Sequence, residues 1–302
     1  MQITSAVLDM LIPGLANKSM HRLSLDGVQF EVMRQGVDFA VDMIQRSRMM
    51  NHFCWAYNGT VDVADSSRLF NAVLHHPFLE DITLDAYTPI GENGYDNLVS
   101  LLTTKSNMTR LSYRSNNVRT EGDTRLSDFI TTNPPLDYHS LVLEDNELED
   151  DDAIMIAGAL QHNTNLHGLN LLNNPFTEVG FAALERAVCD QSSLNSLSDC
   201  NHTCALSISE QRKFNTCSNR RLNRPSKLYQ LMSARNMKGI NVDCLKKEMD
   251  DDDILNLVPN ILECIHRYHS CCGCDIMQRH QVVFPLSIMF EVSRKMPELY
   301  ER

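Results

Sequence analysis

The chain has 302 residues, of which 43% are hydrophobic and 22% charged, a composition typical of a folded globular protein. Its 27 Lys and Arg against 39 Asp and Glu give a formal net charge of −12, without any cluster of basic residues. Because generic affinity for phosphate backbones needs clustered Lys and Arg, this acidity argues against a nucleic-acid partner.

The first element in chain order is a helical stretch from Ala6 to Ala16, with Pro13 near its middle. The start lacks a basic residue before its apolar stretch, and Asp9 interrupts that stretch, so it makes a poor signal peptide. One helix without its strand is what remains of a preceding repeat, and both a minimal cap and a truncated gene model fit it. No window approaches 18 uncharged apolar residues, which argues against a membrane span.

A repeated pattern then fills most of the chain. Its offsets from a starting apolar residue are +3 and +5 apolar, +8 Asn, +10 apolar, +14 Gly, and +18 and +22 apolar. The copy that starts at Leu166 reads Leu169, Leu171, Asn174, Phe176, Gly180, Leu184 and Val188. The copies from Tyr138 and Met108 match it, except that Asp152 replaces the glycine, and weaker copies start at Met20, Met50 and Leu79. An incomplete last copy starts at Leu194, so starts at 20, 50, 79, 108, 138, 166 and 194 are 28 to 30 residues apart.

Each part of the pattern has a physical reason. Apolar residues two apart predict one face of a short strand, and those four apart predict a helix. The Asn suits a turn in which its side chain satisfies backbone groups that leave the strand ladder. The Gly suits a tight entry to the helix. One strand and one helix cannot bury their apolar sides alone, so stacked copies are expected to form a solenoid.

The pattern resembles the ribonuclease-inhibitor subfamily of leucine-rich repeats, over roughly residues 20 to 204. The resemblance implies an α/β right-handed solenoid, a horseshoe with a parallel sheet inside and helices outside, that binds a protein. Residues 201–204 and 284–301 also resemble segments of expanded ribonuclease-inhibitor-like families of diatoms. The expected domains are therefore a leucine-rich repeat domain, 1–204, and a helical C-terminal region, 205–302.

Three helical segments are expected after the repeats, at about 225–236, 250–269 and 284–300. The acidic run Asp250 to Asp253 suits the start of the second, because a helix N-terminus favours negative charge. We expect these helices to cap the open end of the sheet, since exposed apolar ends invite aggregation. A separate module that docks a partner is the alternative.

No catalytic or cofactor signature is present, so we expect neither an enzyme nor a cofactor. The group from Cys264 to Cys274 lacks paired C-x₂-C motifs, and Cys200, His202 and Cys204 fall in the expected last strand and turn. Neither group is predicted to bind metal. Seven of the ten cysteines are scattered and only Cys271, Cys272 and Cys274 crowd together, which in a chain that can bury a full core indicates a reducing compartment, the cytoplasm or the nucleus.

Candidate contact residues lie at offsets +2, +4 and +6, which point away from the helices. The +4 positions are mostly small: Ser24, Cys54, Thr83, Ser112, Val142, Asn170 and Ser198. The charged candidates for partner binding are Asp81, Asp85, Arg110, Arg114 and Glu144. Two interpretations remain open: the charges pair laterally and keep the sheet soluble, or Arg110 and Arg114 mark a contact surface. Trp55 occupies a core position.

The leading functional hypothesis is a non-catalytic scaffold or adaptor that binds a protein. An inhibitor of a basic enzyme is an alternative, which the resemblance and the acidity allow. A GTPase-activating protein of the Ran type is another; it would need an Arg or Asn on a strand-to-helix loop, where Arg119 lies. A substrate-receptor subunit of a ubiquitin ligase is a further alternative, although no F-box-like segment precedes the repeats.

Overall fold

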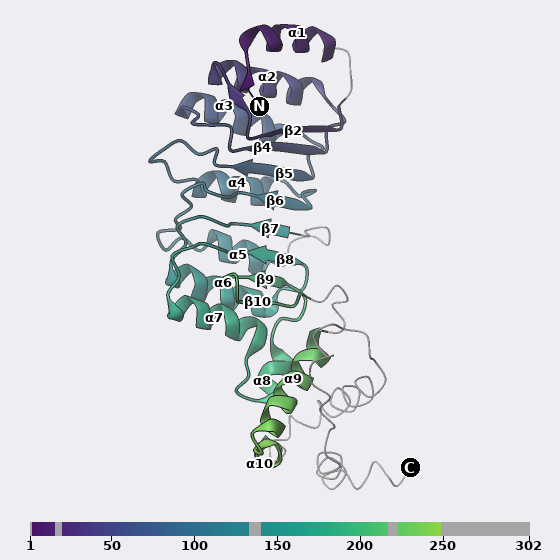
Figure 1. Ribbon diagram of the computed structural model, residues 1–302, viewed down its shortest axis with the longest axis vertical. Coiled ribbons are helices and arrows are strands. Elements are labelled where there is room, and N and C mark those ends of the chain that lie inside the picture. Colours follow the sequence, from purple (N-terminus) through teal and green to yellow (C-terminus); the bar gives the residue numbers. More distant parts are fainter. Residues whose placement is uncertain (1, 16–19, 133–139, 217–222, 249–302) are drawn as a thin grey trace. The chain divides into compact units, whose positions relative to one another are not determined.

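The computed structural model describes residues 2–15, 20–132, 140–216 and 223–248 (Figure 1). The chain divides into two compact units, and each is described by itself. Unit 1 comprises residues 1–184 and 203–214. Unit 2 comprises residues 185–202 and 215–302.

Unit 1 contains a sheet in the strand order β10-β9-β8-β7-β6-β5-β4-β2. Every neighbouring pair is parallel except β9 and β10. The strands are β2 (Arg22–Asp26), β4 (His52–Ala56), β5 (Asp81–Asp85), β6 (Arg110–Ser112), β7 (Ser140–Val142), β8 (Gly168–Asn170), β9 (Ala205–Ser207) and β10 (Lys213–Phe214). The parallel sheet expected from the repeats is therefore confirmed, in sequence order.

One helix follows each of the strands β4 to β8, and the short strand β3 (Gln29–Phe30) comes between β2 and its helix. These helices form a layer on one side of the sheet (Figure 1). They are α2 (Met33–Arg46), α3 (Val63–His75), α4 (Tyr95–Thr104), α5 (Arg125–Thr131), α6 (Asp150–His162) and α7 (Glu178–Cys189). The core between the layers contains the inward strand residues, among them Phe53, Ile82 and Leu111 at 0% exposure. Trp55, also 0% exposed, stacks on Phe30 with ring centroids 5.7 Å apart, so its core position is confirmed.

The N-terminal helix is α1 (Ser5–Leu15), close to the expected range. It is preceded by β1 (Gln2–Ile3), which pairs in parallel with β3. This small second sheet was not expected from the sequence, because two-residue strands carry no readable periodicity.

The Asn at +8, which four repeats carry as Asn58, Asn116, Asn146 and Asn174, tethers its repeat to the preceding one. Asn146, 4% exposed, accepts hydrogen bonds from the backbone N–H groups of Asn116 (3.0 Å) and Val118 (3.1 Å) at Oδ1. Its Nδ2 donates to the Tyr113 carbonyl oxygen at 2.9 Å. Asn174 makes the same bonds in the next repeat: its Nδ2 donates to the Leu143 carbonyl oxygen, and its Oδ1 accepts from the Leu148 backbone N–H. The expected role of the Asn is confirmed, with the addition that most of its bonds reach the preceding repeat.

The helix-entry Gly is also explained by close packing. A Cβ at Gly180 would come within 2.5 Å of Asp150 Oδ1 and 3.1 Å of the Ala153 Cβ. Where Asp152 replaces this Gly, its carboxylate accepts from the Glu149 backbone N–H at 2.8 Å and completes the N-terminal capping box of α6.

The predicted repeat start at Leu194 is wrong. Leu194–Asp199 is helix α8, and the Ser193 hydroxyl caps it by accepting from the Ser196 backbone N–H. Apolar residues three apart fit a helix as well as a strand opening, and the capping serine decides between them. The next strand is β9, so Ser207 and not Ser198 stands beside Asn170 in the sheet. Strands β9 and β10 thus lie beyond residue 204, the boundary expected from the sequence.

Unit 2 contains α8 with α9 (Asn223–Met237) and α10 (Asn241–Glu248), and α9 confirms the helix expected at 225–236. Arg235 and Glu248, with side chains 8% and 14% exposed, form a bidentate salt bridge at 2.8 and 3.0 Å between α9 and α10. The helices expected at 250–269 and 284–300 lie outside the described residues, as does the Cys264–Cys274 group.

Candidate binding face of the sheet

The face of the sheet opposite the helices is called the open face below. Its residues are the outward positions of β2 and β4 to β9 with their following residues. They are Arg22, Ser24, Asp26, His52, Cys54, Ala56, Asp81, Thr83, Asp85, Arg110, Ser112, Arg114, Ser140, Val142, Glu144, Gly168, Asn170, Leu172, Ala205 and Ser207. The central row of this face consists of Ser24, Cys54, Thr83, Ser112, Val142, Asn170 and Ser207. Their side chains are small or medium-sized, so no bulky residue blocks the middle of the face.

Asp85 is hydrogen-bonded within the open face and is not accessible to a partner. Its residue is 5% exposed, and its Oδ1 accepts from the Ser112 hydroxyl at 2.8 Å and the Arg114 backbone N–H at 2.9 Å. Burial raises the pKa of Asp85, and the bonds from Arg114 and Ser112 oppose that rise. A buried carboxylate with these partners stabilises the pairing of β5 with β6.

Arg114 and Glu144 continue this network. The Arg114 Nη1 lies 3.4 Å from Glu144 Oε2, and the Arg114 Nε lies 3.9 Å from Asp85 Oδ2. Asn170 Nδ2 donates to the same Glu144 oxygen at 2.9 Å. Arg114 therefore lies between two carboxylates, Asp85 and Glu144, which belong to the neighbouring repeats.

Asp81 also has a lateral partner, since its Oδ2 lies 3.0 Å from His52 Nδ1. Its other oxygen, Oδ1, is buried without a hydrogen-bond partner among the described residues. Four of the five predicted contact residues are thus paired laterally, as the first of the two interpretations expects.

Arg110 differs from these four. It is exposed, and within the described ranges its guanidinium makes no hydrogen bond or ion pair. On the edge strand β2, Arg22 and Asp26 are exposed with opposite charges. Arg110 therefore stands as an accessible cation between strands whose charges are compensated.

The repeat pattern alone did not identify the lateral partners of the predicted contact residues. His52, Ser112 and Asn170 complete the network, and all three are outward residues of neighbouring strands. Their register was readable from the repeat, but which side chains would bond depended on rotamers that the repeat does not encode.

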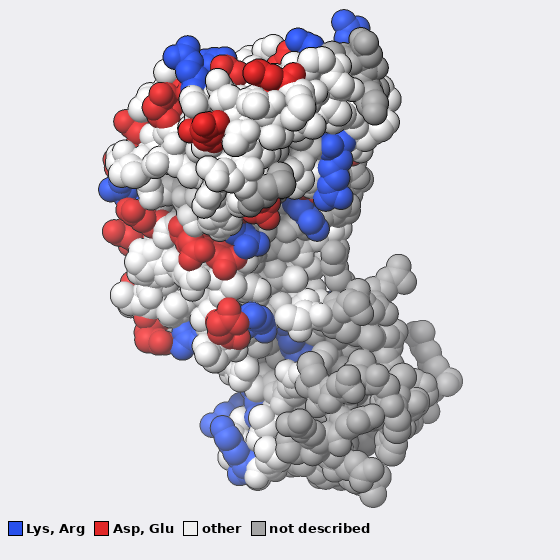
Figure 2. Space-filling model, turned by 45° about the horizontal axis from the view of Figure 1, so that its top comes forward, with Lys and Arg blue, Asp and Glu red and all other residues white. Residues whose placement is uncertain are grey.

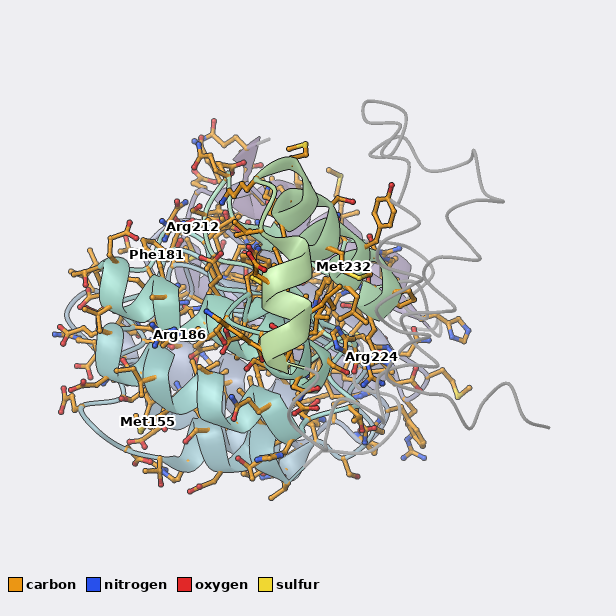
Figure 3. All side chains as sticks on the ribbon, turned by 90° about the horizontal axis from the view of Figure 1, so that it is seen from below. Met155, Phe181, Arg186, Arg212, Arg224 and Met232 are labelled. Carbon is orange, nitrogen blue, oxygen red and sulfur yellow. The ribbon has the colours of Figure 1, made fainter. Side chains whose placement is uncertain are left out.

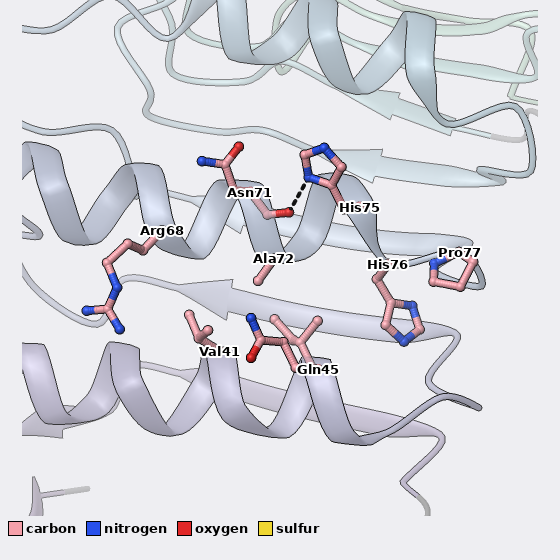
Figure 4. Close-up of a pocket in the computed structure, with 9 residues that line it drawn as sticks. Val41, Gln45, Arg68, Asn71, Ala72, His75, His76 and Pro77 are labelled. Atoms are coloured by element: carbon pink, nitrogen blue, oxygen red, sulfur yellow. Dashed lines mark hydrogen bonds between the residues drawn. The ribbon is translucent and has the colours of Figure 1, made fainter.

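A cavity of about 640 Å³ lies on the helical side between α2 and α3 (Figure 4). Val41, Ile44 and Ala72 supply apolar lining, and His75 Nδ1 lies 2.8 Å from the Asn71 carbonyl oxygen. The polar residue Arg68 is bound to Asp38 and Asp65 at 2.5 and 3.0 Å. Its cation is already neutralised, and the groove shows no acid–base pair for chemistry.

In unit 2, the buried side chain of Lys227 on α9 binds the C-terminal end of α7. Lys227 Nζ donates to the carbonyl oxygens of Val188 and Asn201 and to His202 Nδ1, the last at 3.2 Å. Because Nδ1 accepts, His202 is protonated at Nε2, which donates to the Ser198 carbonyl oxygen at 3.1 Å. Burial lowers the pKa of Lys227 to about 8, and burial with the Lys227 charge lowers that of His202 to about 4.

Arg224, labelled in Figure 3, belongs to the same unit. It donates from Nε to the Ser198 hydroxyl at 2.9 Å, which joins α9 to α8. All three Lys227 donors are used, which marks this cluster as structural.

No group of three potential metal ligands occurs within the described ranges, and Cys54, Cys189, Cys200, Cys204 and Cys244 are free thiols. None of the described helices is both long and apolar enough to cross a bilayer.

The fold and its open face define a class: an α/β solenoid of leucine-rich-repeat type, with one strand and one helix in each full repeat and a buried Asn turn in four of them, at Asn58, Asn116, Asn146 and Asn174. No family model and no curated protein sequence matches the chain. Similar solved structures include an internalin (InlF) from Listeria monocytogenes, at 12% identity over 68% of this chain and 75% of that chain, with a TM-score of 0.35. A TM-score this low supports no inference about function.

Proposed function

We propose that this chain is a non-catalytic scaffold or adaptor that binds a protein partner on its open face. The single observation that carries the proposal is this face itself: seven parallel strands present a continuous row of small or medium-sized side chains, with the exposed cation Arg110 on the central strand β6. Parallel strands stacked in a solenoid give an extended surface that a protein segment can follow.

The repeat length and the Asn and Gly positions support membership in the ribonuclease-inhibitor subfamily of leucine-rich repeats. The sequences of residues 201–204 and 284–301 support the diatom-type group within it. The five free thiols described, of which Cys54, Cys200 and Cys204 are buried, support a reducing location in the cytoplasm or nucleus. The lateral pairing of the acidic residues Asp81, Asp85 and Glu144 disfavours the alternative of an inhibitor that grips a basic enzyme here.

The GTPase-activating alternative depends on Arg119. Its Nε lies 3.1 Å from Glu147 Oε2, and its side chain is 43% exposed. An arginine that must reach a bound nucleotide would first have to leave this carboxylate, so we rank the scaffold higher.

The test uses the full chain as bait in its native lysate, with quantitative mass spectrometry. Thr83→Arg places a long side chain in the central row of the open face. The matched control is Arg34→Glu, an exposed residue in the first turn of α2. Proteins retained by the native chain and the control but lost from Thr83→Arg support the proposal. Equal retention by all three chains contradicts it.

A further inference from the structure

We infer that the partner presents a carboxylate to Arg110, followed by uncharged residues along β7 to β9. This inference rests on the proposed function and specifies the chemistry of its partner. It runs against the net charge of the chain, which would by itself suggest a basic partner.

The first step is which charges of the open face remain available. Asp81, Asp85 and Glu144 each already have a cationic or hydrogen-bonding partner at 2.8 to 3.4 Å. A partner lysine would have to compete with these bonds. Arg110 has none within the described part of the chain, so a carboxylate can bind it without breaking a contact. The other exposed charges of the open face, Arg22 and Asp26, lie on the edge strand β2 and have opposite signs, so Arg110 is the available charge in the middle of the face.

The second step is the range over which charge acts. At physiological ionic strength the screening length is about 8 Å. The net charge of −12 therefore sets the direction of long-range steering, while the choice of side chain at the contact depends on the nearest groups. Lys and Arg are intermixed with Asp and Glu over the face of the molecule in Figure 2, without one large area of a single sign.

The third step is the surface beside Arg110. Beyond Ser140, its neighbour in register on β7, the open-face residues of β8 and β9 are Gly168, Asn170, Leu172, Ala205 and Ser207. None of them is charged. Three strand spacings separate β6 from β9, roughly 14 Å. An extended segment of four or five residues spans that distance, with its acidic residue at β6 and small or apolar residues beyond.

The shape of the Arg110 guanidinium also favours a carboxylate partner. Its planar guanidinium can bind a carboxylate through two parallel hydrogen bonds, which a lysine cannot reproduce. The expected order of affinity is therefore native chain, then Arg110→Lys, then Arg110→Glu.

The test is a random twelve-residue peptide library displayed on phage and selected on the immobilised full chain. Enriched peptides are synthesised, and their dissociation constants are measured with the native chain, Arg110→Lys, Arg110→Glu, Thr83→Arg and the Arg34→Glu control. Circular dichroism establishes that each variant is folded.

The inference predicts peptides enriched in Asp or Glu, bound about ten-fold or more weakly by Arg110→Glu and unchanged with Arg34→Glu. Two results overturn the inference and leave the proposed function standing: peptides whose affinity is weakened by Thr83→Arg but unchanged by Arg110→Glu, and peptides rich in Lys and Arg. Peptides indifferent to both positions, or no enriched peptide at all, overturn both.

Discussion

Replacing Asn146 by Leu tests how the repeats are held together. The substitution leaves three buried backbone groups without their partner: Asn116 N–H, Val118 N–H and the Tyr113 carbonyl. Each buried polar group left unsatisfied costs about 1–3 kcal/mol, so we expect a loss of about 3–6 kcal/mol after some relaxation. A domain is stable by only about 5–15 kcal/mol, so this loss is a large part of the total.

The measurement is urea unfolding followed by circular dichroism, together with hydrogen exchange of the Asn116 and Val118 amides. The control is Asn51→Leu, because Asn51 is exposed and its side chain makes no hydrogen bond within the described ranges; its expected effect is within about 0.5 kcal/mol. An Asn146→Leu variant as stable as the control, with both amides still protected, would refute the reasoning.

Three further predictions follow from individual contacts. An Ala at Gly94 would bring its Cβ within 2.6 Å of the Asn116 carbonyl oxygen, whereas Gly158 in α6 has nothing within 4 Å; we expect a loss of about 1–3 kcal/mol and a gain of about 0.5–1 kcal/mol respectively. Thermal unfolding midpoints that move in the same direction would contradict this. The pKa of His202 is lowered from 6.5 to about 4, so the unfolded chain binds the proton more readily; the contribution of neutral His202 to the free energy of unfolding is complete above pH 6.5 and falls by up to about 3 kcal/mol as the pH drops to 4. Urea titrations across this range should show the slope, and His202→Gln should flatten it; identical slopes would disprove the assignment. Arg235→Met leaves the Glu248 carboxylate without its cation, with only the Leu194 backbone N–H still donating to it at 3.3 Å, and should cost about 3–5 kcal/mol. Arg235→Met with Glu248→Leu should recover most of this loss; a double variant no better than the single would rule out this coupling.

The regular part of the fold was predictable because its physics repeats. Apolar spacing two residues apart placed Leu111 and Tyr113 inward, and the register of β6 on β5 and β7 follows directly. The residue after each outward +6 position has a left-handed backbone, with φ of 50° at Tyr57 and 52° at Ala86. Gly27 adopts it at little cost, but Tyr and Ala disfavour it, so their sequence gave no sign of the turn.

The irregular part was not predictable, because local patterns there fit two structures. The spacing of Leu194 and Leu197 suits a helix and a strand opening, and the chain then takes 37 residues, from 168 to 205, to reach the next strand position. At the candidate site, the repeat placed Asp85 and Arg114 on the open face. It could not show that Asp85 would be buried under bonds from Ser112 and Arg114, since that depends on packing around each side chain.

Site-specific photo-crosslinking tests the central claim, that the open face binds the partner, most directly. A benzoylphenylalanine replaces Ser207 on the open face in one variant and Ser67 on the exposed side of α3 in another, and both are irradiated in native lysate. The account predicts a discrete crosslinked protein with position 207 that is absent with position 67 and lost when Thr83→Arg is added. Crosslinks from position 67 alone, or ones from position 207 that persist with Thr83→Arg, would contradict it.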